Sequence, residues 1–181
     1  HLDFADGRPA GTVDIEELIG LDPRAEATLW HHLTHLDLFP RVAWWNAPTD
    51  CLAPLLADDR RRFVRRRRAD TLWLRIGDVG RALTGRAYLD DGALALAVVD
   101  AMSGTRTTWQ LTADGGRATC VATDAAPELE VEQAALGAMY LGGTSAALLA
   151  GTGAVRGTPA TVARADRLFR WPVAPWCPEV F

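Results

Sequence analysis

Three histidines stand close enough in the sequence to suggest a metal site. His31 and His35 are four residues apart, which places two rings on one face of a helix, as in the zinc motif H-E-x-x-H. His32 lies between them, but no glutamate does, and no third ligand follows at a suitable spacing. Because a catalytic zinc ion needs three protein ligands, we expect solvated or helix-capping histidines and no metal.

The cysteines offer little chemistry of their own. Cys51, Cys120 and Cys177 are odd in number, widely spaced and never arranged as C-x-x-C, so they predict neither a disulfide framework nor a zinc knuckle and fit a reducing cytoplasm. Cys177 would need a base beside it to act as a nucleophile, and no histidine is near it in the sequence. We therefore expect a structural role for Cys177. The chain contains no lysine, which excludes a lysine Schiff base and a Walker-type phosphate lysine.

Two glycine-containing segments superficially resemble phosphate-binding loops. Residues 141–145 read Leu-Gly-Gly-Thr-Ser, and residues 151–153 read Gly-Thr-Gly. Both follow helical patterns, whereas the Walker and Rossmann loops follow a strand. Glycine commonly ends a helix, so these segments predict helix termini.

The most basic segment is residues 60–68, in which seven of nine residues are arginine. Such a run can indicate a nucleic-acid site or a site for a coenzyme A phosphate. However, Asp58, Asp59 and Asp70 flank it, and the chain carries a net charge of -4. Because nucleic-acid binding needs a basic footprint, we expect no nucleic-acid partner and favour a surface or subunit-contact strand.

The end of the chain is the remaining candidate for chemistry. Its apolar side chains include Trp171, Trp176 and Phe181. Chain ends usually fray in solvent, but exposing these side chains to water is costly, so docking of the tail is favoured. Apolar surroundings would raise the pKa of the terminal carboxylate from about 3.5 toward useful base strength, whereas nearby donors or cations would lower it. The sequence leaves open which effect dominates.

The elements that must position these residues begin with an α/β unit. Residues 12–19 alternate apolar and polar side chains at their start and predict a strand. Asp22 and Pro23 then provide the N-cap and first-turn proline of an amphipathic helix. A second strand is predicted over residues 41–45 and a short helix over residues 52–56.

The rest of the chain predicts a sheet followed by helices, with a domain boundary near residue 70. Asp78 is a suitable N-cap for a helix, and Asp114-Gly115-Gly116 indicates a hairpin within an antiparallel sheet. Strand alternation places Trp109 and Leu111 on the buried face. The predicted strands are residues 71–76, 93–99, 107–112 and 117–122, and the predicted helices are 131–140, 144–150 and 159–170. Three prolines keep the tail extended.

Composition places the chain among globular proteins, with 49% apolar and 23% charged residues. Its apolar runs are far shorter than the roughly 20 residues of a membrane-spanning helix. The first residues lack a secretory signal, and the first one is not methionine. We expect a cytoplasmic chain that begins in mid-protein and has no membrane partner.

Four segments together resemble the Eis (enhanced intracellular survival) acetyltransferases. They are residues 70–79 (DTLWLRIGDV), the hairpin ending in ATDA at 122–125, residues 136–143 (LGAMYLGG), and the tail that ends at Phe181. The family joins two GNAT-like domains to a sterol-carrier-like domain. The resemblance implies an α+β fold, in which residues 1–69 end the second GNAT-like α/β domain. Residues 70–181 then form a sterol-carrier-protein-like domain, an antiparallel sheet packed with helices, with a catalytic C-terminal tail.

The resemblance also implies an acetyl-CoA-dependent N-acetyltransferase acting on a primary amine, cationic and of the aminoglycoside or lysine type. The terminal carboxylate of Phe181 would be the general base, and Glu179 and Trp176 are candidate substrate contacts. The family's penultimate acidic residue is absent here, since Val180 precedes Phe181. No GNAT acetyl-CoA loop is found, so acetyl-CoA is expected to bind a domain missing from this chain, and the isolated fragment is expected to be inactive. Family members form hexamers, which implies a homo-oligomer.

Two other functions stay open on sequence grounds. One is a sterol-carrier-like lipid-binding module, and the other is a structural oligomerisation domain without catalysis of its own. A continuous apolar cavity would favour lipid binding. A core filled by its own side chains, with the tail leading outward, would favour the enzyme part.

Overall fold

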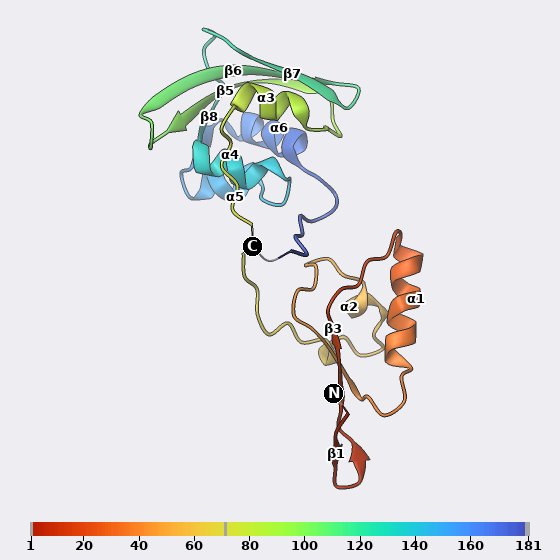
Figure 1. Cartoon of the computed structure of the whole chain (residues 1–181). Coiled ribbons are helices and arrows are strands. Elements are labelled where there is room, and N and C mark those ends of the chain that lie inside the picture. The colour runs from red at the N-terminus through yellow and green to blue at the C-terminus, as the bar shows by residue number, and fades with distance from the viewer. Residues whose placement is uncertain (1, 71, 180–181) are drawn as a thin grey trace. The chain divides into compact units, whose positions relative to one another are not determined.

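The computed structural model describes residues 2–70 and 72–179, and it divides into two compact units (Figure 1). Unit 1 comprises residues 1–71 together with the tail residues 176–181, and unit 2 comprises residues 72–175. Among the described residues, no helix combines the length and apolar character needed to cross a membrane. The predicted boundary after residue 69, as a boundary between family domains, stays a prediction.

Unit 1 is built on a parallel strand–helix–strand motif. Strand β3 (Thr12–Ile15) pairs in parallel with β4 (Arg41–Trp44), and α1 (Pro23–Thr34) connects them. Asp22 caps α1 by accepting a hydrogen bond from the Ala25 backbone N–H at 2.8 Å. The predicted α/β unit and its N-cap are confirmed, although the first strand ends four residues earlier than the sequence pattern indicated.

The remaining elements of unit 1 are short. Strands β1 (Phe4–Ala5) and β2 (Arg8–Pro9) form a hairpin that the sequence analysis missed. Helix α2 (Ala53–Leu56) matches the predicted short helix, and a 3-10 turn covers Arg60–Arg62. The small core contains Ile15, Leu18 and Trp30, with Leu33, Val42, Trp44, Leu52 and Ala53 packed against them.

Unit 2 contains a five-stranded mixed sheet in the order β7-β6-β5-β8-β9. Its strands are β5 (Gly92–Asp100), β6 (Thr105–Asp114), β7 (Arg117–Ala122), β8 (Leu129–Glu132) and β9 (Val155–Gly157). The predicted hairpin is confirmed: Gly115 and Gly116 have φ of 56° and 81°, a region that glycine reaches without strain. The predicted antiparallel pairing of β5, β6 and β7 is confirmed. Strand β8, which the sequence analysis did not identify, pairs with β5 in parallel and makes the sheet mixed.

Four helices cover one face of this sheet, as Figure 1 shows. They are α3 (Val79–Gly85), α4 (Gln133–Tyr140), α5 (Ala146–Gly151) and α6 (Pro159–Phe169). Asp78 and Ser145 cap α3 and α5 with their side chains. The α+β fold class is confirmed.

Two local predictions for unit 2 are wrong. Residues 72–76 form no strand: the segment passes close to α4, where the carbonyl oxygen of Leu74 approaches Gly137 and that of Ile76 accepts a hydrogen bond from Gln133. Val131 belongs to strand β8 and not to a helix. Val131 was misassigned because a buried apolar side chain fits the pattern of a strand or of a helix. Residues 72–74 have an apolar pattern, but their side chains are exposed, so the pattern did not reflect burial in a sheet.

The interior of unit 2 is filled by large side chains. The most buried, each at most 1% exposed, are Leu83, Leu94, Leu96, Leu111, Leu129, Val131, Leu136, Met139, Leu168 and Phe169. Leu111 therefore lies on the buried face as predicted, and Trp109 is partly buried against the same cluster. The Trp109 ring packs over α3 at Gly80, where an added Cβ would lie 2.7 Å from the ring atom Cζ3.

This contact makes Gly80 a sensitive position. Gly80→Ala should lower the free energy of unfolding by about 1–3 kcal/mol, because the methyl group must displace the Trp109 ring. Gly85→Ala in the same helix is the matched control, since a Cβ there has nothing within 4 Å, and it should be neutral or stabilise by up to about 1 kcal/mol. Urea titrations followed by circular dichroism would measure both, and equal effects would contradict the packing of α3 on β6.

Candidate functional site

The tail makes contacts within both units. Its residues up to 175 belong to unit 2, and those from 176 belong to unit 1. Residues 170–179 form neither helix nor strand, as the prolines predict. In unit 2 the tail lies against the turn after α4, where Gly142 has a φ of 81°. A Cβ on Gly142 would lie 2.6 Å from the Cβ of Trp171, and one on Gly143 would lie 2.6 Å from the Pro175 ring. This Gly-Gly pair therefore ends a helix, as predicted, and also leaves room for the tail.

In unit 1 the tail is bound by Asn46, which lies just beyond the end of β4. The Asn46 side-chain amide donates hydrogen bonds to the carbonyl oxygens of Cys177 and Pro178, both at 3.1 Å. Its backbone carbonyl accepts a hydrogen bond from the Trp176 indole N–H at 2.9 Å. One residue thus makes three hydrogen bonds to three successive tail residues.

Tryptophan side chains support this attachment. The Trp176 ring meets Trp44 edge to face, with centroids 6.2 Å apart and an interplanar angle of 78°. Trp44 in turn lies 6.0 Å from Trp30 of α1. Edge-to-face pairs are a favoured aromatic geometry. The tail is therefore connected through Trp44 to the buried core of unit 1.

Helix α1 is itself fixed next to this cluster by Glu26. The Glu26 carboxylate accepts hydrogen bonds from the Trp30 indole N–H at 3.1 Å and from the Leu52 backbone N–H at 2.7 Å. Neighbouring Cys51 is buried, and burial raises the pKa of its thiol, so it is poorly suited to act as a nucleophile. Glu26 therefore connects α1 to the segment that precedes α2, and the thiol beside it is not activated.

The residues predicted to act in catalysis fall in this tail. Trp176 and Glu179 are three residues apart in unit 1; the Trp176 ring is half-buried, and Glu179 is exposed. The carboxylate of Phe181 lies outside the described residues, so its role stays a prediction. Cys177 donates a weak hydrogen bond from its thiol to the Glu179 carbonyl at 3.5 Å. Sequence reasoning missed Asn46 and Trp44, although an asparagine directly after a strand was a usable signal.

The histidines remain local to α1. The Nδ1 atom of His35 lies 2.7 Å from the carbonyl oxygen of His31, and the two rings are 4.0 Å apart. Within residues 2–70 and 72–179, no three histidine, cysteine or acidic side chains lie close enough together to hold a metal ion.

The arginine-rich segment lies on the surface, since all seven of its arginines are exposed. Arg61 pairs with Asp59 at 2.9 Å, and this contact holds the pKa of the Asp59 carboxyl below its ordinary value. Arg65 donates to the Thr49 carbonyl oxygen at 2.8 Å. The predicted surface location is confirmed, but the prediction of a strand is wrong, because Arg60–Arg62 form a 3-10 turn and residues 63–68 form neither helix nor strand. A role in subunit contact stays a prediction.

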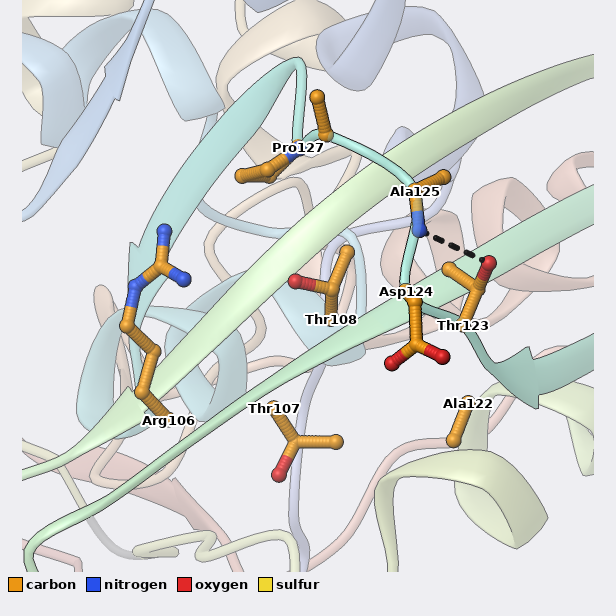
Figure 2. Close-up of a pocket in the computed structure, with 9 residues that line it drawn as sticks. Arg106, Thr107, Thr108, Ala122, Thr123, Asp124, Ala125 and Pro127 are labelled. Carbon is orange, nitrogen blue, oxygen red and sulfur yellow. Dashed lines mark hydrogen bonds between the residues drawn. The ribbon is translucent and has the colours of Figure 1, made fainter.

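Two surface pockets in unit 2 bring polar groups together. The first lies between the start of β6 and the loop after β7, with Arg106, Thr108 and Asp124 among its lining residues (Figure 2). The Arg106 guanidinium is already paired with Glu130 at 3.2 Å. In the second pocket, Arg75 and Asp100 form an ion pair at 2.6 Å. The Ser103 hydroxyl in this pocket also donates to the Asp100 carboxylate, at 2.7 Å. The hydrogen bond from Ser103 and the contact with Arg75 hold the pKa of Asp100 below its ordinary value, so this carboxylate is a weak base.

The helix that follows a strand in unit 1 is a poor acetyl-CoA site. A GNAT-type site would present free backbone N–H groups at a helix N-terminus to the pyrophosphate. At α1, Pro23 lacks an N–H, Asp22 already occupies the Ala25 N–H, and Glu26 adds negative charge to the first turn. These residues do not fit a pyrophosphate, so we assign no acetyl-CoA contact to the N-terminus of α1.

Comparison with known proteins gives matches to both units. Residues 3–76 match the family model of an acetyltransferase (GNAT) domain, and residues 79–178 match that of a sterol carrier protein domain. The chain is 38% identical over 178 residues to an "Uncharacterized N-acetyltransferase" of Streptomyces griseus, covering 96% of this chain and 42% of that protein. It is 36% identical over 142 residues to N-acetyltransferase Eis of Mycobacterium bovis, covering 78% of this chain and 35% of Eis.

A solved structure of an Eis protein is also similar to this chain. The crystal structure of Eis1 from Mycobacterium abscessus matches with a TM-score of 0.82 at 28% identity, covering 94% of this chain and 43% of that one. The chain therefore spans less than half the length of each of these three proteins.

The attachment of the tail predicts its sensitivity to proteolysis. Trp176→Ala removes one hydrogen bond and one aromatic contact, together worth about 1–3 kcal/mol, so digestion by carboxypeptidase should accelerate about 5- to 150-fold. Trp176→Phe keeps an aromatic ring but loses the hydrogen-bond donor, so its digestion rate should lie between those of the wild type and Trp176→Ala. Trp45→Ala is the control, because that tryptophan is 67% exposed. If all three variants are digested at the wild-type rate, the tail is not held as described.

Proposed function

This chain belongs to the Eis-type N-acetyltransferase family, with a GNAT acetyltransferase domain followed by a sterol carrier protein domain, and we propose that it is part of an acetyl-CoA-dependent enzyme that acetylates primary amines. The observation that carries this proposal is the attachment of the tail to the GNAT-type unit through Asn46 and Trp176. These contacts fix residues 176–178 on the GNAT-type unit, which supports a role for the chain end that follows them.

In this proposal the carboxylate of Phe181 is the general base. A primary amine is protonated near neutral pH, and its nitrogen has no lone pair for attack until it loses a proton. The terminal carboxylate accepts that proton, and the neutral amine is then nucleophilic toward an acyl carbonyl. Acetyl-CoA supplies the activated acetyl group. A positioned base of this kind contributes about 10²–10⁴-fold to rate.

The substrate we propose is a cationic amine, such as an aminoglycoside or a protein lysine. The chain has a net charge of -4, which favours the approach of cations. Glu179 is exposed two residues before the terminus and provides a carboxylate for a second ammonium group. Trp176 contributes less directly, because its indole N–H is already bonded to Asn46.

Acetyl-CoA is proposed to bind a part of the protein outside these 181 residues. The relatives are more than twice as long as the chain, and α1 does not fit a pyrophosphate. We propose that the whole protein is a cytoplasmic homo-oligomer, in line with the unpaired cysteines and the exposed arginine-rich segment.

The core of unit 2 favours this role over lipid carriage. A lipid-carrying domain needs an apolar space that its own side chains leave open. Here Phe169, Met139 and Leu136, each at most 1% exposed, pack within one continuous cluster. The two pockets described above are lined in part by charged side chains. We therefore do not propose a lipid-carrier function.

Modification of the terminus tests the role of the carboxylate. In the whole protein, amidating Phe181 by ligation removes the charge with little change of shape, and adding residues after Phe181 moves the charge away. Both changes should lower turnover at saturating substrate by about 10²–10⁴-fold, with acetyl-CoA binding by calorimetry unchanged. Phe181→Leu is the matched control and should be milder, since it keeps the carboxylate. Wild-type turnover of the amidated enzyme would show that the base lies elsewhere.

A further inference from the structure

The tail has few hydrogen bonds of its own near its end. Pro175 and Pro178 have no backbone N–H, and residues 170–179 belong to no helix or strand that could pair their carbonyl groups. Carbonyl groups that leave water need donors from elsewhere in the protein. For Cys177 and Pro178, both donors come from the Asn46 amide.

The chemistry of this contact requires an amide in one orientation. Two carbonyl oxygens face the same side-chain group, so only an N–H-bearing group is attractive there, and the reversed amide would place oxygen against oxygen. An aspartate of the same shape would add repulsion. The contact therefore distinguishes asparagine from its closest isostere.

The location of Asn46 near the end of β4 also suits a residue that holds the tail in place. It follows Trp44, which is the last residue of β4 and packs against Trp30 and Trp176. Groups supported by helices or strands are placed more precisely than groups on loops. Asn46 lies in a turn, but only two residues after the end of β4. The half-buried Asn46 is thus connected to the core of unit 1 within two residues.

We propose that Asn46 is a positioning residue: its side-chain amide fixes the tail at Cys177 and Pro178 so that the terminal carboxylate is presented in a restricted place. Phe181 is three residues beyond Pro178, so chain geometry keeps its carboxylate within about 10 Å of the fixed point. Restricting a reacting group in this way reduces the entropy lost on reaching the transition state. The effect of Asn46 on catalysis rests on the function proposed above, whereas its hydrogen bonds to the tail do not depend on that function.

A simpler role for Asn46 is to form the turn toward Pro48. Asparagine is common in turns because its side chain bonds to nearby backbone groups. Here the side chain bonds instead to residues 131 and 132 positions later in the chain. A turn role predicts that losing the tail leaves the Asn46 amide unchanged, and this difference can be measured.

The first experiment is nuclear magnetic resonance on this chain labelled with ¹⁵N-asparagine. Asn46 is the single asparagine of the 181 residues, so one side-chain NH₂ pair is expected. That pair should be shifted and exchange slowly in the native chain, and it should move toward free-asparagine values in Trp176→Ala. Trp45→Ala should leave it unchanged. A free-asparagine spectrum in the native chain, or no response to Trp176→Ala, would overturn the proposal.

The second experiment is kinetic and uses the whole protein. Asn46→Asp and Asn46→Leu should lower kcat about 5- to 100-fold, as expected for the loss of two hydrogen bonds, with KM for acetyl-CoA unchanged and faster carboxypeptidase digestion. Thr49→Ala, an exposed position in the same connection, is the control and should behave as wild type.

The two proposals fail in different ways. If amidation of Phe181 abolishes turnover while both Asn46 variants keep wild-type kcat and a protected tail, the positioning role is wrong and the general base stands. If the amidated enzyme is fully active while the Asn46 variants release the tail, the attachment is real and the general-base proposal is wrong.

Discussion

The main constraint on the structure is that a proline-rich tail, which forms no secondary structure, must be held by other parts of the chain. A segment with prolines at 172, 175 and 178 cannot form a helix or a continuous strand ladder, so its polar groups and apolar rings need partners elsewhere. The chain meets this need twice. Gly142 and Gly143 leave space for Trp171 and Pro175 in unit 2, and Asn46 with Trp44 binds residues 176–178 in unit 1.

This constraint explains several features that otherwise look unrelated. The Gly-Gly pair after α4 has one glycine in a left-handed conformation and two with no room for a side chain. Trp44 ends a parallel strand whose partner helix contributes Trp30, so the aromatic cluster is fixed by backbone pairing on one side and by the Glu26 carboxylate on the other. A sterol-carrier-type unit with a filled core can then serve as a scaffold for the chain end.

The sequence predicted the elements whose signals are local. Asp22, Asp78 and the Gly115-Gly116 hairpin were found because a cap or a tight turn depends on a few adjacent residues. The parallel pairing of β8 with β5 was missed, since pairing depends on residues far apart in the chain. The candidate site shows the same limit: the apolar tail could be expected to dock, but Asn46 is more than 130 positions away from its partners, and no local pattern connects them.

The central claim is our proposal that the carboxylate at the end of the tail, which unit 1 binds at residues 176–178, is the base of the reaction. Its most direct test is a ¹³C titration of the whole protein carrying a ¹³C-carboxyl label at Phe181 only, compared with the pH dependence of kcat/KM. A base must be deprotonated to act, so the rate should rise with pH through the pKa of that carboxylate. The account predicts that the acidic limb of the rate profile and the ¹³C titration share one midpoint. A carboxylate that titrates more than about one pH unit away from the acidic limb, where the difference represents about 1.4 kcal/mol, would contradict it.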